Sequence, residues 1–190
     1  MTPHEPLGTV SSATLSLEAY TNKTLDVRQM EGEIPLLFGD DAIEIKGARS
    51  LLTELDEANI PWAVVTSGTR PLVEGWLKIL RFAEPRCLVT AEDVTNGKPD
   101  PACYLLGRQR LGIRGAEKPL VVEDAPAGIR AGKAAGFDVL ALATTHEINE
   151  LIEAGADWIV RNLESVTLET DMEGLGFLRV SFHNILQVRN

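Results

Sequence analysis

The sequence predicts an α/β fold in which a parallel sheet is covered by helices on both faces. From residue 46 onward, short apolar runs rich in β-branched residues alternate with longer segments of helical periodicity. The links between them are short, and Pro, Gly and Asp stand at many of the boundaries. Strands that alternate with helices in this way favour a parallel sheet, whose ligands bind beyond the carboxyl ends of the strands.

The first group of expected elements lies before residue 91. Leu51, Leu52 and Leu55 form one apolar stripe of a helix. Pro71 stands where the first turn of a helix tolerates proline, and an apolar face follows it. The expected elements are a helix at 47–58, a strand at 62–66, a helix from Pro71 to about Leu80 and a strand at 87–90.

The second group continues to residue 160. Asp100 is a typical N-cap, and Pro101 follows it at the first helical position. Gly136 marks a helix end, and residues 144–147 have the spacing of a capping box. The expected elements are a helix from Pro101 to about Arg110, a strand at 120–123, a helix at 126–135, a strand at 139–143, a helix ending at Gly155 and a short strand at 158–160.

The two ends of the chain carry weaker patterns. Residues 1–30 predict no clear element, and residues 13–17 alternate only weakly. The pattern also weakens beyond Ser165, although residues 177–188 are apolar enough to pack. The well-defined α/β pattern therefore ends near residue 165.

The acidic composition argues against one class of partner. The chain has a formal net charge of −10 and a pI near 4.8, and its Lys and Arg residues form no run. A nucleic-acid-binding protein needs a basic surface, so we expect no DNA or RNA partner. A phosphate site would have to depend on local Lys residues, backbone N–H groups or a metal ion.

The two cysteines, Cys87 and Cys103, form neither a disulfide framework nor a zinc-binding pattern. The N-terminus lacks the basic start and apolar run of a signal peptide, and no stretch of about 18 apolar residues could cross a bilayer. We therefore expect a cytoplasmic protein with no membrane partner. The sequence does not indicate an oligomeric state.

Two adjacent carboxylates, Glu123 and Asp124, end the apolar strand at 120–123. Such neighbours repel each other, and a bound cation would remove the repulsion; hard oxygen ligands of this kind suit Mg²⁺. The alternative is that one acid caps the helix starting near Pro126 while the other is solvated. When only these two acids are considered, helix capping is a common explanation for such residues and competes with metal binding.

Two further candidates lie upstream. After the strand at 62–66, Gly68 allows close backbone approach, and the Ser67 hydroxyl with the N–H groups of the next helix could hold a phosphate. A simple Ser/Thr helix cap is the alternative. Lys98 lies between a glycine and two prolines, whose stiffness could aim its ammonium group into a cleft. A solvated loop lysine is the usual alternative.

The order of these motifs resembles the haloacid dehalogenase (HAD) superfamily. Within it, the chain is similar to the fungal glycerol-phosphate and 2-deoxyglucose-6-phosphate phosphatases. The similar segments are residues 62–70, 97–101, 123–129 and 131–136. The segment at 31–35 resembles the stretch that leads from the cap of those enzymes back to the core. The resemblance covers roughly residues 25–165.

The resemblance implies a Mg²⁺-dependent phosphatase of small phosphorylated metabolites, of the sugar or polyol phosphate type. It implies that Ser67 and Gly68 bind the phosphate and that Lys98 pairs with the nucleophile and the phosphate. It also implies that Glu123 and Asp124 hold Mg²⁺, directly or through water. The catalytic role would then fall on Lys98 together with a nucleophile.

One motif of the family is missing. In the family an Asp-x-Asp pair at the end of the first strand supplies the nucleophile, but no Asp here is followed two places later by another Asp. The family's first strand lies between the strands that carry Ser67 and Glu123, so its loss would leave two strand edges exposed. We therefore expect an HAD-like, Rossmannoid sheet that lacks its central strand and most of its helical cap.

The resemblance divides the chain into three parts. Residues 1–45 would be a remnant of the N-terminal arm and cap linker, residues 46–165 the HAD-like core, and residues 166–190 a tail packing on or beside that core. Asp40 and Asp41 fall in the linker, and we do not expect them to replace the nucleophile. This pattern fits a family member truncated at its N-terminus, or a gene sequence that lacks its first exon.

Three functional hypotheses follow from the sequence. The first is a phosphatase of small sugar or polyol phosphates whose activity is impaired, with an unknown nucleophile. The second is a non-catalytic remnant that binds a phosphorylated ligand or a partner protein. The third is that the chain forms no stable monomer.

Overall fold

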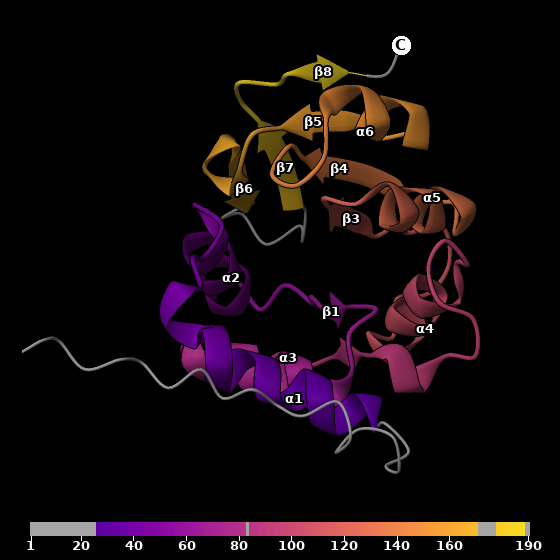
Figure 1. Cartoon of the computed structure of the whole chain (residues 1–190). Coiled ribbons are helices and arrows are strands. Elements are labelled where there is room, and N and C mark those ends of the chain that lie inside the picture. Colours follow the sequence, from indigo (N-terminus) through magenta and orange to yellow (C-terminus); the bar gives the residue numbers. More distant parts are fainter. Residues whose placement is uncertain (1–25, 83, 171–177, 189–190) are drawn as a thin grey trace, which may run out of the picture.

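The computed structural model describes residues 26–82, 84–170 and 178–188, and Figure 1 shows their arrangement. In chain order the elements are α1 (Val27–Phe38), η2 (Gly39–Asp41), α2 (Ala48–Glu57), β1 (Val64–Val65), α3 (Arg70–Ile79), β2 (Leu88–Val89), η3 (Ala91–Asp93), α4 (Ala102–Arg110), β3 (Leu120–Glu123), α5 (Pro126–Ala134), β4 (Asp138–Leu142), α6 (Ile148–Ala154), β5 (Trp158–Val160), η4 (Leu163–Ser165), β6 (Val166–Thr170), β7 (Leu178–Phe182) and β8 (Gln187–Val188).

A four-stranded sheet organises the second half of the chain. Its order is β3-β4-β5-β8; the first three strands are parallel, and β8 pairs antiparallel with β5. Helix α5 packs on one face with α6 beside it, and Ile129, Val139 and Leu151 are fully buried there. The parallel α/β arrangement predicted from the sequence is confirmed.

The other face of this sheet is covered in a way that the sequence pattern did not predict. Strands β6 and β7 form an antiparallel pair. Val166 and Phe182 from this pair pack against Leu140, Leu142 and Val160 of the sheet. Residues beyond Ser165 therefore contribute to the packed interior, and β8 extends the sheet itself.

Strands β1 and β2 form a separate parallel pair. The N–H groups of Val64 and Thr66 donate to the carbonyls of Cys87 and Val89, so the backbone groups of Val65 face away from β2. Strand β3 pairs only with β4, and Figure 1 shows no described strand between β1 and β3. The two open edges expected in place of a central strand are present among the described residues.

Helix α1 is an element that the sequence pattern did not predict. Asp26 caps it by accepting a hydrogen bond from the Arg28 N–H at 3.1 Å. Pro35 lies inside the helix and packs on α3, where a Cβ added to Gly75 would come within 2.7 Å of the proline ring. Apolar residues recur every three or four positions along Val27–Phe38, but an internal proline argues against a helix.

One predicted helix start is wrong. The capping box of α6 is formed by Glu147 and Glu150, and residues 144–147 do not form it. The Glu147 backbone is extended, and its N–H donates to the Glu150 carboxylate at 3.1 Å. The segment before Glu147 is therefore a loop at the end of β4, where it can contact a ligand.

Candidate active site

Three polar segments that are distant in the sequence lie together at the carboxyl ends of β1 and β3. They line a cavity of about 510 Å³. Thr66 and Ser67 follow β1, Lys98 lies in the loop before α4, and Glu123 and Asp124 come from the end of β3. The structure therefore brings the predicted lysine, hydroxyl and acid pair to one place.

The turn after β1 exposes a hydroxyl to the cavity. Ser67 is exposed, lines the cavity and makes no hydrogen bond to any other residue that the structure describes. The neighbouring Gly68 donates its N–H to Thr66 Oγ1 at 3.0 Å. A Cβ at Gly68 would approach the end of the Leu72 side chain at 2.9 Å, so a larger residue there would require that side chain to move. Ser67 remains able to donate to a ligand.

The N-terminus of α3 differs from the expected phosphate cradle. The Thr69 N–H donates to Glu31 Oε2 at 2.9 Å, and the Arg70 N–H donates to Glu92 Oε1 at 3.1 Å. Two carboxylates thus satisfy the positive end of the helix. The expectation that the N–H groups at this helix start hold a phosphate is wrong for these two groups.

Lys98 is held between the two sheets. Its Nζ donates to the Val65 carbonyl at 3.1 Å and forms a short ion pair with Glu123 Oε1. The ammonium group also lies 4.9 Å from the centre of the Tyr104 ring. The lysine side chain is only 11% exposed, so the alternative of a solvated loop lysine does not hold. Lys98 instead bridges the open edge of β1 and the end of β3.

Glu123 accepts hydrogen bonds on both of its carboxylate oxygens. Oε1 accepts from Lys98 and from the Tyr104 hydroxyl, the latter at 2.5 Å. Oε2 lies 3.2 Å from the Asp124 N and 3.4 Å from the Ala125 N, both of which donate to it. Donors from the protein itself therefore surround this carboxylate, whose side chain is 9% exposed.

Tyr104 is a site residue that the sequence analysis missed. It is buried on α4, and burial together with the negative charge of Glu123 raises the pKa of its phenol. The hydroxyl is therefore protonated at neutral pH and acts as a donor. No sequence pattern marks this residue, because its contact with Glu123 exists only when α4 packs beside β3.

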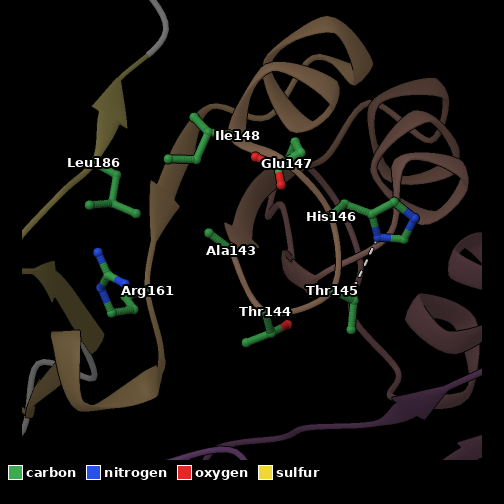
Figure 2. A pocket seen from close by; sticks show the side chains of 8 residues that line it. All are labelled: Ala143, Thr144, Thr145, His146, Glu147, Ile148, Arg161 and Leu186. Atoms are coloured by element: carbon green, nitrogen blue, oxygen red, sulfur yellow. Dashed lines mark hydrogen bonds between the residues drawn. The ribbon is translucent and has the colours of Figure 1, made fainter.

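Asp124 is oriented by a residue from the β4–α6 loop. The Thr145 hydroxyl lies 2.8 Å from Asp124 Oδ2 and 2.9 Å from His146 Nδ1. Figure 2 shows Thr145 and His146 on one side of a neighbouring pocket of about 300 Å³ and Arg161 on the other. Thr144 lines both this pocket and the larger cavity, so the two are adjacent.

The residues present fit a hard cation only through Asp124. Mg²⁺ keeps several waters and usually takes one or two carboxylates together with substrate phosphates. Asp124 offers such a carboxylate, whereas the oxygens of Glu123 are already engaged. Within the described ranges, no three His, Cys, Asp or Glu side chains cluster as a metal site. Lys98 and the two acids give this part of the lining a net charge of −1, which disfavours a phosphate without a cation.

Other candidates lie away from the cavity. Asp40 and Asp41 are exposed in η2 and do not line it. No helix in the part of the chain that the structure describes is long and apolar enough to cross a membrane.

The turn after β1, the loop before α4 and the end of β3 thus bring a hydroxyl, a buried lysine and an acid pair to one cavity of an α/β protein. A family model described as haloacid dehalogenase-like hydrolase matches residues 11–136, and the chain belongs to this family. The resemblance inferred from the motifs is thereby confirmed.

Known proteins agree with this assignment. The chain is 45% identical over 156 residues to glycerol-1-phosphate phosphohydrolase 1 of Saccharomyces cerevisiae, covering 78% of this chain and 60% of that protein. It is 36% identical to 2-deoxyglucose-6-phosphate phosphatase 1 of the same yeast, covering 77% and 66%. A solved structure titled as a putative beta-phosphoglucomutase from Thermotoga maritima matches with a TM-score of 0.64 and 30% identity, covering 72% and 64%. The chain thus spans about 60% of the length of the first curated relatives that it matches.

Proposed function

We propose that this is the site of a phosphatase of small sugar or polyol phosphates, which binds such monoesters in this chain but whose hydrolytic activity is impaired. The relatives described above are phosphatases of such compounds by name, and the cavity of about 510 Å³ has the size of a small-molecule site. The observation that carries the proposal is that the buried Lys98 lines the same cavity as the Ser67 hydroxyl, which has no hydrogen-bond partner among the described residues. Together they offer a charge-assisted and a neutral hydrogen bond to phosphoryl oxygens.

Different residues of the cavity would bind the phosphate and the cation. Lys98 uses two of its three N–H donors within the protein, which leaves one for a ligand. Asp124 would hold Mg²⁺, with Thr145 orienting its carboxylate. When bound, Mg²⁺ supplies Lewis-acid stabilisation of charge on the phosphoryl oxygens. This cation would also offset the net negative charge of the lining.

The nucleophile of the reaction is not assigned to any described residue. The family's Asp-x-Asp pair does not occur in these 190 residues, and this observation favours a second candidate function. In that alternative, the chain binds a phosphorylated ligand or a partner protein without turnover. Among the described residues, the edges of β1 and β3 that face each other pair with no strand, and such an edge can take up an added strand of a partner.

Binding and turnover of a phosphate ester separate the two functions. We expect Lys98→Met to weaken the binding of glycerol 1-phosphate, measured by calorimetry with millimolar MgCl₂, by about tenfold or more, because one charge-assisted hydrogen bond is lost. Lys118→Met is the matched control, since Lys118 is exposed on a loop and should leave the affinity unchanged.

Hydrolysis of p-nitrophenyl phosphate is measured in parallel. We expect the chain to hydrolyse it no faster than Lys98→Met does. Turnover that depends on Lys98 would reveal a nucleophile in this chain and reject the non-catalytic alternative. Equal affinities of all three proteins for glycerol 1-phosphate would contradict the proposed phosphate site itself.

A further inference from the structure

Glu123 differs from Asp124 in how its carboxylate is used. Four donors of this chain converge on Glu123: the Lys98 ammonium group, the Tyr104 hydroxyl and the N–H groups of Asp124 and Ala125. The side chains of Lys98 and Glu123 are 11% and 9% exposed. Asp124 Oδ2, by contrast, accepts from the Thr145 hydroxyl, and Asp124 is half-buried beside the cavity. The two acids therefore have different surroundings, although they are neighbours in the sequence.

The space for the Glu123 side chain is provided by Gly128. A Cβ at Gly128 would lie 2.1 Å from the Glu123 carboxylate carbon. The carboxylate therefore lies directly over the first turn of α5, where only glycine leaves room for it. Burial, space and donors all match this one orientation of the side chain.

We propose that Glu123 is the internal counter-ion that aims Lys98 at the cavity, and that Tyr104 is the positioning residue that holds Glu123 in place. This inference deepens the proposed function, because it assigns roles within the same phosphate site. The cation of that site then binds Asp124 and not Glu123. The two adjacent acids, which the sequence suggests form one metal site, therefore have different roles: Glu123 pairs with Lys98, and Asp124 binds the cation.

The physical reason is the cost of breaking a buried ion pair. If Glu123 turned toward a cation, Lys98 would lose its carboxylate while its side chain remains largely buried. The Tyr104 hydroxyl, itself buried, would lose the acceptor that it has among the described residues. A divalent ion at Asp124 reaches the phosphate without either loss. The arrangement thus keeps the lysine charge available to the phosphoryl group.

The test follows the ammonium groups of the full chain by ¹H–¹⁵N NMR while MgCl₂ is added. An ammonium signal is visible only where hydrogen bonds slow its exchange with water. Lys133 is the internal control, because its Nζ pairs with Asp157 at 2.5 Å, remote from the cavity lining. Backbone amide shifts of Asp124 and Thr145 report whether Mg²⁺ binds.

We expect a Lys98 signal that stays in place when the Asp124 and Thr145 amides have reached saturation with Mg²⁺. A Lys98 signal that shifts or disappears with the same Mg²⁺ dependence, while Lys133 is unchanged, would overturn the proposal, because Glu123 would then have moved to the cation. A missing Lys98 signal in the presence of the Lys133 signal would overturn it as well.

Two variants, measured without Mg²⁺, test whether Glu123 is the counter-ion of Lys98 and whether Tyr104 positions Glu123. Glu123→Gln should speed exchange of the Lys98 ammonium protons by about tenfold or more, and Tyr104→Phe by about threefold, as hydrogen bonds to the charged pair are lost. Lys133 should be unaffected in both. Unchanged Lys98 exchange in Tyr104→Phe would reject the positioning role, even if that variant were less stable.

The same data separate this inference from the proposed function. If Mg²⁺ moves neither the Asp124 nor the Thr145 amide, the proposed cation site fails. The counter-ion role is then still decided by the two variants: faster Lys98 exchange supports it, and unchanged exchange overturns it.

Discussion

The interactions within the second half of the molecule, residues 120–188, differ from those within the first half, the described residues before 120. In the second half, residues 120–188, the four-stranded sheet packs through side chains such as Val139, Leu140 and Ile159, which are at most 1% exposed. In the first half, helix α1 leaves Leu36 79% and Leu37 70% exposed. The second half therefore has an apolar core on both faces of its sheet, whereas in the first half Val89 and Cys103 join that core and α1 leaves large apolar side chains exposed.

Charged hydrogen bonds also join the elements of the first half. Glu31 of α1 accepts from the Thr69 N–H at the start of α3. Asp93 accepts from the Thr90 N–H at 2.8 Å and from Arg110 at 2.6 Å. The hydrogen bond from Arg110, followed by that from Thr90, lowers the pKa of the Asp93 carboxyl. Polar contacts of this kind respond to pH, whereas apolar packing does not.

The candidate site spans the boundary between these two halves. Ser67 belongs to the first half, and Glu123 and Asp124 belong to the second half, whose sheet is packed on both faces. Lys98 connects the two through Val65 and Glu123. The acid pair is therefore supported by a sheet that is packed on both faces, while the hydroxyl turn depends on the contacts that join the halves.

The largest expected effect tests the packed half directly. Leu140→Ala should lower the free energy of unfolding by about 2–5 kcal/mol, because it leaves a cavity between the sheet and the β6–β7 pair. Leu36→Ala on exposed α1 should change it by no more than about 0.5 kcal/mol. Urea titrations of both variants make the comparison. Equal losses would show that the two halves do not differ in packing.

A smaller effect tests how the packed half supports the site. Gly128→Ala should cost about 1–3 kcal/mol, because the new Cβ would overlap the Glu123 carboxylate and displace it. Gly97→Ala is the control, since nothing lies within 4 Å of a Cβ placed there. Thermal denaturation compares the two variants. If Gly128→Ala were as stable as the control, Glu123 would have another orientation of similar energy.

The smallest of the three expected effects tests how the stability of the first half depends on pH. Asp93→Asn should lower the free energy of unfolding at neutral pH by about 1–2 kcal/mol. The hydrogen bonds from Arg110 and Thr90 would then reach a neutral amide and no longer a carboxylate. The folded pKa of Asp93 is depressed, so its contribution is present above the unfolded value of about 3.9 and is lost as the pH falls below it.

Urea titrations at a series of pH values measure this loss. The difference between Asp93→Asn and the unaltered chain should be constant from neutral pH to about pH 5 and should shrink below about pH 4. If the difference in free energy of unfolding did not shrink as the pH fell below about 4, the charge of the Asp93 carboxylate would not contribute to stability.

Local sequence patterns predicted much of the second half. The strand at 120–123, the helix beginning at Pro126 and its stop before Gly136 agree with the structure, because apolar runs, a proline in the first turn and a glycine at positive φ act within a few residues. Helix α1 was missed, since its internal Pro35 argues against a helix, whereas in the fold this proline is buried against Gly75 of α3.

The family, the alternation of strands and helices, and the candidates Ser67, Lys98, Glu123 and Asp124 could be read from the sequence, because contiguous motifs carry them. The contacts that these four side chains make depend on the packing of the whole fold. This packing buried Lys98 against Glu123, brought Tyr104 and Thr145 to the two acids, and placed carboxylates on the N–H groups of α3. The reason is physical: hydrogen bonds between residues 19 to 38 positions apart depend on how helices and strands pack, which no local pattern encodes.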